Sequence, residues 1–413
     1  MRKISSRQWA WLLYDPANAA YALIVRTVVA PIFLAAAAKG VWSDSQVTSN
    51  WSLTASAAGI TAGILSVLAG PPVDAKRKKV QMVMLFTMLG LLSTLAYIFV
   101  PFGMPQAVLL ISFTGISSFM ASNSFYDSLL IGISTPQERD FLSTTGYASG
   151  YAGGLLSFLL CLPLLSFADG KYFFTGAFII AASWWGLGSL PLFLRVREDN
   201  VSPAPQNAVK LKDTFKFILS EKNILLFLIA YFLYIDGVGT ILLAATPLAA
   251  GLKINTTSIM VTILLLQLAG LPFTLLYGRL AEKFSARKMI CAAIGCYVLI
   301  AMIVTIMSCC ENLKLRQYLF YIAAALIGTS QGGIQSLSRS LFSRIIPEAR
   351  AAELFAVYNI FGKFTTIVGP VFIFIATEFT GKAELGITML TVPFILGAML
   401  LSKVKIPHPE QRS

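Results

Sequence analysis

The sequence predicts an all-α membrane protein with twelve transmembrane helices, arranged as two pseudo-symmetric six-helix bundles. Three observations predict this fold class: the composition, the length of the apolar runs and an echo between the two halves of the chain. Of the 413 residues, 56% are hydrophobic and only 12% are charged, and the mean hydropathy is +0.74. Ordinary soluble domains carry about 25% charged residues, so the composition excludes a water-soluble protein with a normal surface.

The apolar runs are long and uniform, and charged loops separate them. MVMLFTMLGLLSTLAYIFV, for example, is long enough to cross about 30 Å of hydrocarbon as a helix. Membrane strands would need alternating segments of about ten residues, which these runs do not show. We expect spans at residues 9–38, 50–73, 80–101, 106–133, 141–168, 172–194, 223–251, 256–280, 288–309, 317–344, 351–377 and 385–401.

The longest polar stretch divides the chain near its middle. We expect an N-terminal bundle over residues 1–195, a cytoplasmic linker over 196–222 and a C-terminal bundle over 223–413. Within the linker, SPAPQN has the composition of a flexible segment. The spacing of Leu211, Phe215, Ile218 and Leu219 among lysines predicts a basic amphipathic helix on the cytoplasmic membrane surface.

The two halves echo each other in their loops. GPPVDAKRKK follows the second span and GRLAEKFSARK follows the eighth, and their first glycines lie 278 − 70 = 208 residues apart. LLYD in the first span likewise corresponds to LYID in the seventh. Two six-helix repeats are a common plan for transporters.

The formal charge of +13 indicates membrane topology rather than a nucleic-acid partner. Lysines and arginines gather at the N-terminus, after Asp74, in the linker and after Gly278, whereas the alternate loops carry few. By the positive-inside rule, both termini are cytoplasmic, and the basic loops face anionic headgroups of the inner membrane if the source is bacterial. The first span is too long and too polar for a cleaved signal peptide, and we expect it to be retained.

Each half carries a glycine that is followed four residues later by a carboxylate and then by basic residues. The glycine allows two helices to approach closely, and the carboxylate can cap a helix or pair with a basic side chain. We expect a cytoplasmic gate on both halves, although either loop alone could be a solvated loop that sets topology. The expected gate residues are Gly70, Asp74, Lys76, Arg77, Gly278, Glu282, Lys283, Arg287 and Arg339.

Polar and ionisable side chains also fall inside the expected spans. A charge at the centre of a span costs on the order of 2.5–3.5 kcal/mol on insertion scales, so such residues are candidates for function. Two structural alternatives remain open: Asp127 can lie at the rim against linker bases, and Arg26 can snorkel outward. The expected substrate or coupling residues are Asp15, Asn18, Arg26, Asn123, Asp127, Asp236, Gln331, Gln335, Asn359 and Lys363.

Asp236 is the candidate for proton coupling. It lies 236 − 223 = 13 residues after the start of the seventh span, near the middle of the bilayer. Burial favours the protonated carboxyl, whereas a nearby cation such as Lys363 favours the carboxylate. A group held between these effects can couple transport to protons, and a structural ion pair is the alternative.

The stretch WLLYDPANAAYALIVR leaves the register of the first span open. If the helix begins near Trp9, Asp15 lies inside it. If it begins at Pro16, Asp15 is a cap, and Trp9, Trp11 and Tyr14 form an interfacial aromatic belt. Asp15 and Arg26 are 26 − 15 = 11 residues apart, within about 20° of three α-helical turns. We expect both to share one face, toward a polar cavity, in either register.

The fifth span contains glycines at helical spacing. In TGYASGYAGG, Gly146, Gly150 and Gly154 are four residues apart, and Gly153 lies beside the last. Such spacing permits close helix contact. We expect this contact between the two halves, either sliding or static.

Six segments of the chain match a family pattern. They are LYDPANAAY, FYDSLL, TGYASGYAGG, SWWGLGSLPLF, AYFLYIDGVGTI and SQGGIQSLSRSLFSRIIPEARAAELFAVYNIFGK. These segments resemble the vacuolar amino-acid effluxer-like (autophagy-related) family of the major facilitator superfamily. Two departures stand out: the first gate loop lacks the basic residue directly after Asp74 and the later glycine, and Asp127 stands where the pattern has asparagine. The resemblance implies a rocker-switch transporter whose first, fourth, seventh and tenth spans line a cavity, and for eukaryotic relatives it implies amino acids leaving a vacuole.

We therefore expect a monomeric secondary transporter of a small polar solute, such as an amino acid, with protons as the coupling ion. An uncoupled facilitator or exporter and a non-transporting sensor or scaffold are the alternatives. An enzyme, a cofactor or a metal site is not expected, because the single histidine, His408, lies in the tail and no Walker-type loop is present.

Overall fold

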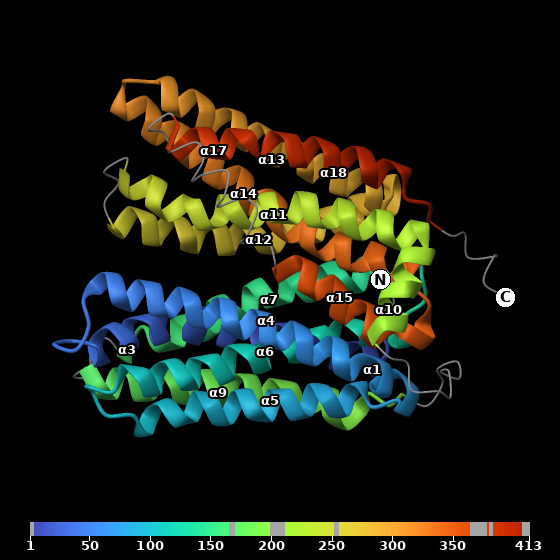
Figure 1. Ribbon diagram of the computed structural model, residues 1–413, viewed down its shortest axis with the longest axis horizontal. Helices are drawn as coiled ribbons and strands as arrows, with labels where there is room; N and C mark the ends of the chain where they lie inside the picture. Colours follow the sequence, from blue (N-terminus) through green and yellow to red (C-terminus); the bar gives the residue numbers. More distant parts are fainter. Residues whose placement is uncertain are drawn as a thin grey trace. The chain divides into compact units, whose positions relative to one another are not determined.

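The computed structural model describes residues 4–164, 170–198, 211–251, 256–363, 378–379 and 383–406, and the regular elements in these ranges are helices (Figure 1). The first group is α1 (Ser6–Leu12), α2 (Tyr14–Ala20), the π-helix η1 (Tyr21–Val29), α3 (Ala30–Ala37), α4 (Asp44–Lys76), α5 (Lys79–Ala96), the short η2 (Tyr97–Phe99), α6 (Pro105–Ile133), α7 (Arg139–Cys161) and α9 (Gly170–Arg195). The second group is α10 (Leu211–Ser220), α11 (Lys222–Gly251), α12 (Thr256–Phe284), α13 (Ala286–Cys309), α14 (Leu313–Ile345), the short η3 (Glu348–Arg350), α15 (Ala351–Lys363), α17 (Ala383–Met389) and α18 (Thr391–Lys403).

Nine stretches of the described ranges are long and apolar enough to cross a membrane, and each overlaps one expected span. Two further helices, α7 and α14, are long but rich in Ser, Thr, Gly and charged residues, and α15 is described over thirteen residues only. The number of twelve spans therefore stays a prediction. The nine stretches are Ser6–Ala37, Gln46–Lys76, Lys79–Phe99, Pro105–Ile133, Tyr172–Arg195, Lys222–Leu242, Leu264–Phe284, Ala286–Met307 and Leu385–Lys403.

Contacts divide the chain into two compact units. Unit 1 comprises Met1–Thr135, Ser149–Thr214 and Pro347–Ile360, and unit 2 comprises Pro136–Ala148, Phe215–Ile346 and Phe361–Ser413. Each unit thus includes one short segment from the other half of the sequence. We call Pro136–Ala148 and Pro347–Ile360 the exchanged segments. The bundle bounds expected from the sequence stay a prediction.

In unit 1, α6 packs against α4 and α5, and α9 packs against α2 and α5 (Figure 1). Aromatic side chains fill the space between these helices. The Trp11 ring stacks on the Tyr126 ring with 4.7 Å between centroids, and Tyr97 stacks on Phe178 at 4.4 Å. Unit 1 therefore has a core with stacked aromatic rings between its helices.

The first span begins at α1, so the earlier of the two expected registers is correct. The Ser5 hydroxyl accepts the Gln8 N–H (3.2 Å), and the Gln8 side chain accepts the Ser5 N–H (2.9 Å), which forms a capping box. Asp15 is not a cap, because α2 follows Leu13 without a side-chain cap. The aromatic-belt interpretation is also wrong for Trp11, which is fully buried.

The π-helix η1 changes the geometry of the first span. Its turns hold more residues than α-helical turns, and it contains Arg26, which is half-buried. The expectation that Asp15 and Arg26 share a face assumed a uniform α-helix between them, and this assumption is wrong. π-helical turns are frequent at functional sites, so Arg26 remains a candidate on other grounds.

The glycines in the second part of α7 pack within unit 1. A Cβ atom at Gly150 would lie 3.7 Å from the Asp15 carbonyl oxygen, and one at Gly153 would overlap Pro16. Gly154 likewise faces Ala19. The expectation that these three glycines lie between the two halves is therefore wrong, because they pack against α2 of their own unit.

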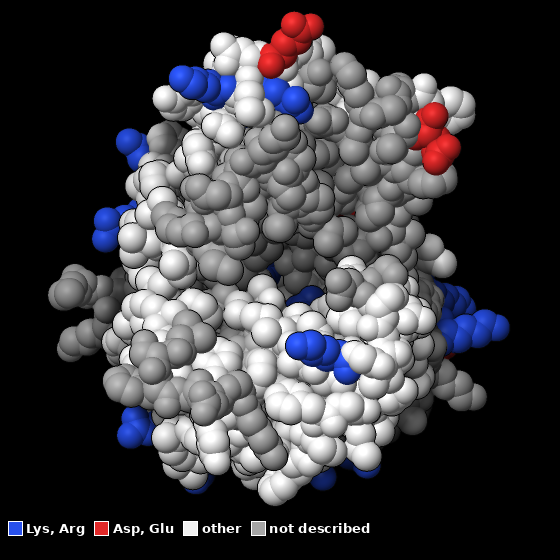
Figure 2. All heavy atoms as spheres, turned by 90° about the vertical axis from the view of Figure 1, so that its left-hand side faces the viewer, with Lys and Arg blue, Asp and Glu red and all other residues white. Residues whose placement is uncertain are grey.

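In unit 2, α14 packs against α12 and α13, and α11 packs against α18. A helix is present where the sequence predicts one in the linker, as α10, which buries Ile218 and exposes Phe215 and Leu219. Its position on the cytoplasmic membrane surface stays a prediction. In the view of Figure 2, Lys and Arg side chains are scattered singly, mostly toward the edge of the view, and most of the described surface between them is uncharged.

Candidate functional site

In unit 1, the Asp74 carboxylate caps the beginning of α15. Its Oδ1 accepts the Ala352 N–H (3.1 Å), and its Oδ2 accepts the Glu353 N–H (3.0 Å). The Lys79 Nζ lies 3.1 Å from Asp74 Oδ1, and both side chains are buried. First-turn N–H groups lack an intrahelical acceptor and lie at the positive end of the helix dipole. A carboxylate at this place is therefore stabilised by two backbone donors and one cation.

Gly70 allows α4 and α15 to meet without side chains between them. A Cβ atom at Gly70 would lie 2.6 Å from the Glu353 Cα and 2.9 Å from its nitrogen. Because these atoms are backbone, a side chain at position 70 would have to move a helix. Gly70 and Asp74 thus form one site, as the sequence predicts, whereas Lys76 and Arg77 are exposed and Lys79 supplies the cation.

Four expected substrate residues meet in two hydrogen bonds in unit 1. Asn18 on α2 donates from Nδ2 to Asn123 Oδ1 (2.7 Å), and Asn359 on α15 donates from Nδ2 to Asp127 Oδ2 (3.1 Å). Asn123 and Asp127 are one turn apart on α6 and so share a face. We call these four residues the amide ladder. Asp15 and Arg26 are half-buried and lie outside these two bonds.

In unit 2, Arg339 of α14 holds the first turns of α7. Arg339 is 1% exposed, and its Nε donates to the Ser143 hydroxyl (2.9 Å) while its Nη2 donates to the Ser143 carbonyl (3.0 Å). Its guanidinium carbon lies 4.5 Å from the centre of the Tyr147 ring, a cation–π contact. The Ser143 hydroxyl in turn donates to the Ser336 carbonyl (2.7 Å).

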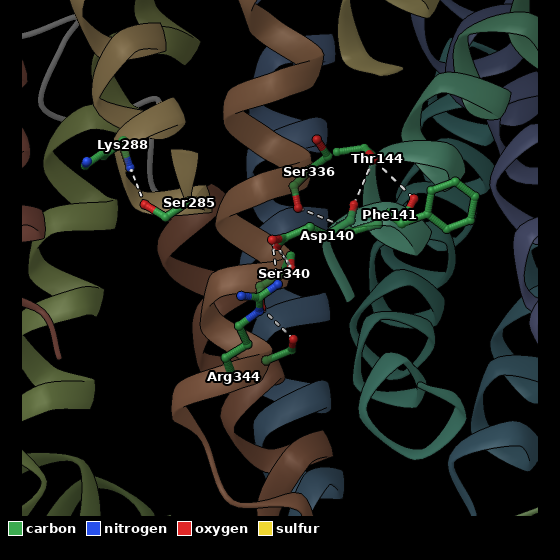
Figure 3. A network of polar contacts seen from close by, with 10 residues as sticks. Asp140, Phe141, Thr144, Ser285, Lys288, Ser336, Ser340 and Arg344 are labelled. Carbon is green, nitrogen blue, oxygen red and sulfur yellow. Dashed lines mark hydrogen bonds and ion pairs between the residues drawn. The ribbon is translucent and has the colours of Figure 1, made fainter. Parts of the chain in front are cut away.

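A second group of contacts joins the same two helices. Asp140 of α7 accepts a hydrogen bond from the Ser340 hydroxyl and pairs with Arg344 of α14, with 2.5 Å between Oδ2 and Nη2 (Figure 3). Arg139 donates from Nη1 to the Ser343 carbonyl (2.7 Å). The exchanged segment Pro136–Ala148 is thus bound to α14 by a network of side chains.

Among the expected gate residues of the second half, Gly278 and Arg287 contact different helices. A Cβ atom at Gly278 would overlap the Thr144 hydroxyl and lie 2.9 Å from the Thr144 Cβ, so Gly278 faces α7 as Gly70 faces α15. Glu282 and Lys283 are exposed. Arg287 donates to the Ser402 and Val404 carbonyls at the end of α18 (3.0 and 2.9 Å). Glu282 is therefore not placed as a buried cap in the way that Asp74 is.

Asp236 lies in the middle of α11 and is 2% exposed. Gln331 and Gln335 are half-buried, one turn apart on α14. The side chain of Lys363 lies outside the described residues, so its pairing with Asp236 stays a prediction. Within the described ranges, no three His, Cys, Asp or Glu side chains are grouped to bind a metal ion.

Comparison with known proteins decides the family. Residues 131–411 match the family described as "Vacuole effluxer Atg22 like". The uncharacterized MFS-type transporter YxiO of Bacillus subtilis is 32% identical over the whole of this chain and 97% of its own length. The chain belongs to the Atg22-like family. It is therefore a transporter of the major facilitator superfamily, and the family resemblance seen in the sequence is confirmed.

Other relatives of this Atg22-like transporter are more distant. Autophagy-related protein 22 of Saccharomyces cerevisiae (strain S288c) is 25% identical over 60% of the chain, a match that spans 54% of the yeast protein. A bacterial homologue of ferroportin superposes with a TM-score of 0.73 at 15% identity, covering 98% of this chain and 99% of its own. The proton:xylose symporter XylE gives a TM-score of 0.68 at 15% identity, covering 97% and 95%. These structures show that the fold is shared.

Apart from Arg339, the residues of the unit 2 network escaped the sequence analysis, although the Atg22-like chain contains a signal for some of them. The two exchanged segments repeat a pattern of proline, arginine and tyrosine at a separation of 347 − 136 = 211 residues. In each segment an acidic side chain, Asp140 or Glu353, lies at or next to the helix start and pairs with an arginine. The repeated residues are Pro136, Arg139 and Tyr147 in one segment and Pro347, Arg350 and Tyr358 in the other.

Proposed function

We propose that this Atg22-like protein is a secondary active transporter of a small polar solute, an amino acid or a related metabolite. Two six-helix bundles, twelve spans in all, move by rocker-switch alternating access, with both termini in the cytoplasm and, in a bacterium, the inner membrane as the location. The observation that carries the proposal is the amide ladder, which puts Asn18, Asn123, Asp127 and Asn359 together among apolar helices.

The amide ladder suits a zwitterionic solute. Each amide offers both a donor and an acceptor. The ionised Asp127 carboxylate offers acceptors and no donor. Because polar groups inside a membrane span are costly unless bonded, a solute that replaces these bonds must supply matching groups. The ammonium of an amino acid matches Asp127, and its carboxylate matches an amide N–H. This substrate class also agrees with the vacuolar effluxer resemblance.

The Asp74 site supplies the gate of this mechanism. While the carboxylate caps α15, the first turn of that helix is bound to α4. Release of α15 leaves the Ala352 and Glu353 N–H groups without their acceptor, so the capped state resists opening. The Lys79 ammonium keeps its ion pair with Asp74 in either state. Binding of solute at Asn359, two turns further along α15, gives a physical route by which substrate can change that balance.

Asp236 is the proposed proton-coupling residue, with Asp15 as the second candidate. Asp236 is buried in an apolar span, where loss or gain of a proton changes the free energy of burying its side chain. The fold neighbour XylE is a proton:xylose symporter, so the shared fold is compatible with proton coupling.

Uptake by the purified full-length protein in proteoliposomes tests the proposal. We expect a mixture of radiolabelled amino acids to enter, and we expect a pH gradient to increase the accumulation. Asp236→Asn should remove the effect of the gradient but keep counterflow, because it removes the titrating group alone. Asp213→Asn on the exposed face of α10 is the matched control and should behave like the wild type.

Three results would contradict parts of the proposal. Failure of every amino acid to enter, with a different metabolite raising the melting temperature of the protein, would exclude the substrate class. Counterflow that no pH gradient changes would identify an uncoupled facilitator. A normal gradient response in Asp236→Asn would remove this residue from the coupling mechanism.

A further inference from the structure

A small pocket lies in unit 1 where α1 begins and the chain leaves α9. Its walls come from the first turn of α1, the start of α5, the last turns of α6 and the segment after α9. The ionisable side chains in the wall are Arg7, Lys79, Arg197 and Glu198. The pocket is not part of the amide ladder. Of its ionisable side chains, Lys79 belongs to the Asp74 site, whereas the proposed transport mechanism does not use Arg7, Arg197 or Glu198.

Hydrogen bonds of the next residues in the chain, Gln8 and Glu198, anchor the segments that carry the two arginines of this pocket. Gln8 donates from Nε2 to the Ile133 carbonyl (3.2 Å), which ties the turn that carries Arg7 to the end of α6. Glu198 Oε1 accepts the Val80 N–H (2.9 Å), which ties the segment after α9 to the start of α5. The Ile133 carbonyl and one oxygen of Glu198 are thus occupied by donors of the protein itself.

The charge around the pocket is positive. Among the side chains of its wall, Arg7, Lys79 and Arg197 are basic and Glu198 alone is acidic. The Lys79 Nζ pairs with Asp74, and Arg7 and Arg197 are exposed to solvent. Arg195 lies next in the chain, with its Nη1 3.5 Å from the Ser6 hydroxyl. Guanidinium groups bind phosphate oxygens with two parallel hydrogen bonds.

An apolar stripe on α9 leads toward the same arginines. Leu187, Leu190 and Leu194 are spaced by three and four residues and are 68%, 43% and 74% exposed. They lie in the stretch Tyr172–Arg195, which is apolar enough to cross a membrane, so they face acyl chains in a bilayer. The stripe ends at Arg195, where the headgroup region of one leaflet begins.

We propose that Arg7 and Arg197, with Arg195 beside them, bind the phosphate of an anionic phospholipid whose acyl chain lies along the leucine stripe of α9. The positive pocket recognises the phosphate, and the stripe recognises the chain. By the positive-inside rule, this end of unit 1 faces the cytoplasm, so the lipid belongs to the inner leaflet. Basic pockets between helices on that side are suited to anionic headgroups.

Lipid retention by the full-length protein tests the site without measuring transport, so the result does not depend on the proposed function. Protein in mild detergent is mixed with phosphatidylglycerol or phosphatidylcholine of identical acyl chains, and bound lipid is counted by native mass spectrometry. The double variant Arg7→Gln/Arg197→Gln should lose about 30-fold in phosphatidylglycerol affinity, since each basic residue near an anionic headgroup contributes about 1 kcal/mol. Lys403→Gln/Lys405→Gln removes the same charge from exposed positions of unit 2 and should leave binding unchanged.

Competition and hydrogen exchange complete the test. Glycerol 3-phosphate and inorganic phosphate share the phosphate but lack acyl chains, and neither should displace the lipid at equal concentration. In the wild type, phosphatidylglycerol but not phosphatidylcholine should slow amide exchange at residues 5–9 and 190–198, which checks the site even if a variant fails to fold.

Several results would overturn the proposal. They are unchanged retention in the arginine variant, equal loss in both double variants, and absent protection in the wild type. Displacement by glycerol 3-phosphate at equal concentration would identify a site for soluble phosphate compounds and would exclude the lipid.

Discussion

Unit 1 and unit 2 each hold an exchanged segment, but they hold it with different chemistry. In unit 1, the contact is made to the backbone of α15: Asp74 accepts two N–H groups, and Gly70 touches the Glu353 backbone. In unit 2, the contact to α7 is made largely by side chains, among them Arg339 on Ser143 and Arg344 on Asp140. One exchanged segment is thus held by a helix cap, and the other is held by a network of side chains.

The difference indicates how sensitive the contacts of each exchanged segment are to a single substitution. A cap depends on one carboxylate, so removal of Asp74 affects both N–H groups and the Lys79 ion pair at once. A network is distributed, because Arg139, Arg339 and Arg344 make separate contacts with different atoms of α7 or α14. We therefore expect single substitutions to damage unit 1 more than unit 2.

Asp74→Ala should have the largest effect. It leaves the buried Lys79 ammonium without its partner, and breaking a buried ion pair in this way costs about 3–5 kcal/mol. Thermal unfolding of purified protein in detergent, followed by tryptophan fluorescence, should show a clear fall in melting temperature. Lys79→Met in the Asp74→Ala background should recover part of the loss, since the orphaned charge is then gone.

Arg344→Ala provides the comparison in unit 2. Asp140 keeps the Ser340 hydroxyl as a donor in this variant, and Arg139 and Arg339 keep their contacts. The fall in melting temperature should be smaller than that of Asp74→Ala. An equal or larger fall would show that the unit 2 attachment is no more distributed than the cap.

Alanine at the two close-contact glycines should have an intermediate effect of about 1–3 kcal/mol, the usual cost of overpacking. Gly70→Ala meets backbone, whereas Gly278→Ala meets the Thr144 side chain. Adding Thr144→Ala to Gly278→Ala should therefore restore part of the lost melting temperature and transport, because it removes the Thr144 hydroxyl and methyl groups.

No side-chain deletion can relieve Gly70→Ala in the same way, since its nearest neighbours are main-chain atoms of Glu353. Glu353→Ala, added to Gly70→Ala, is the matched double variant, and it should restore neither melting temperature nor transport. Recovery there, or its absence in the Gly278 pair, would contradict the distinction between backbone and side-chain contacts.

Much of this architecture could be predicted from the sequence because a membrane imposes simple rules. Apolar runs of sufficient length identified the nine stretches that the described ranges contain, and the Gly70–Asp74 spacing identified the cap. The same spacing does not make Glu282 a buried cap, because that side chain is exposed, and its expected gate role stays a prediction. A four-residue interval places glycine and acid on one helix face, but the partner helix decides whether the acid finds backbone N–H groups.

Other features depend on contacts distant in sequence or on backbone geometry. Asp140 and Arg344 are 344 − 140 = 204 residues apart, and no local pattern pairs them. The π-helix η1 has an apolar sequence that suits an ordinary α-helix equally well. Among the basic residues after Asp74, periodicity could not select Lys79, because the turn between α4 and α5 determines which lysine reaches the carboxylate.

That turn also carries the prediction with the smallest expected effect. Arg77 has φ +51° and ψ +53° at the end of α4, and its N–H donates to the Asp74 carbonyl (3.3 Å) while the Lys78 N–H donates to the Val73 carbonyl (3.0 Å). A left-handed residue at this place usually is glycine, because Cβ strains the backbone. Arg77→Gly should therefore unfold at a higher temperature than Arg77→Ala, by an amount equivalent to about 1 kcal/mol. Both variants lose the same side-chain contacts, so their difference isolates the backbone. If the two variants melt at the same temperature, the left-handed conformation at position 77 is not strained by a Cβ atom.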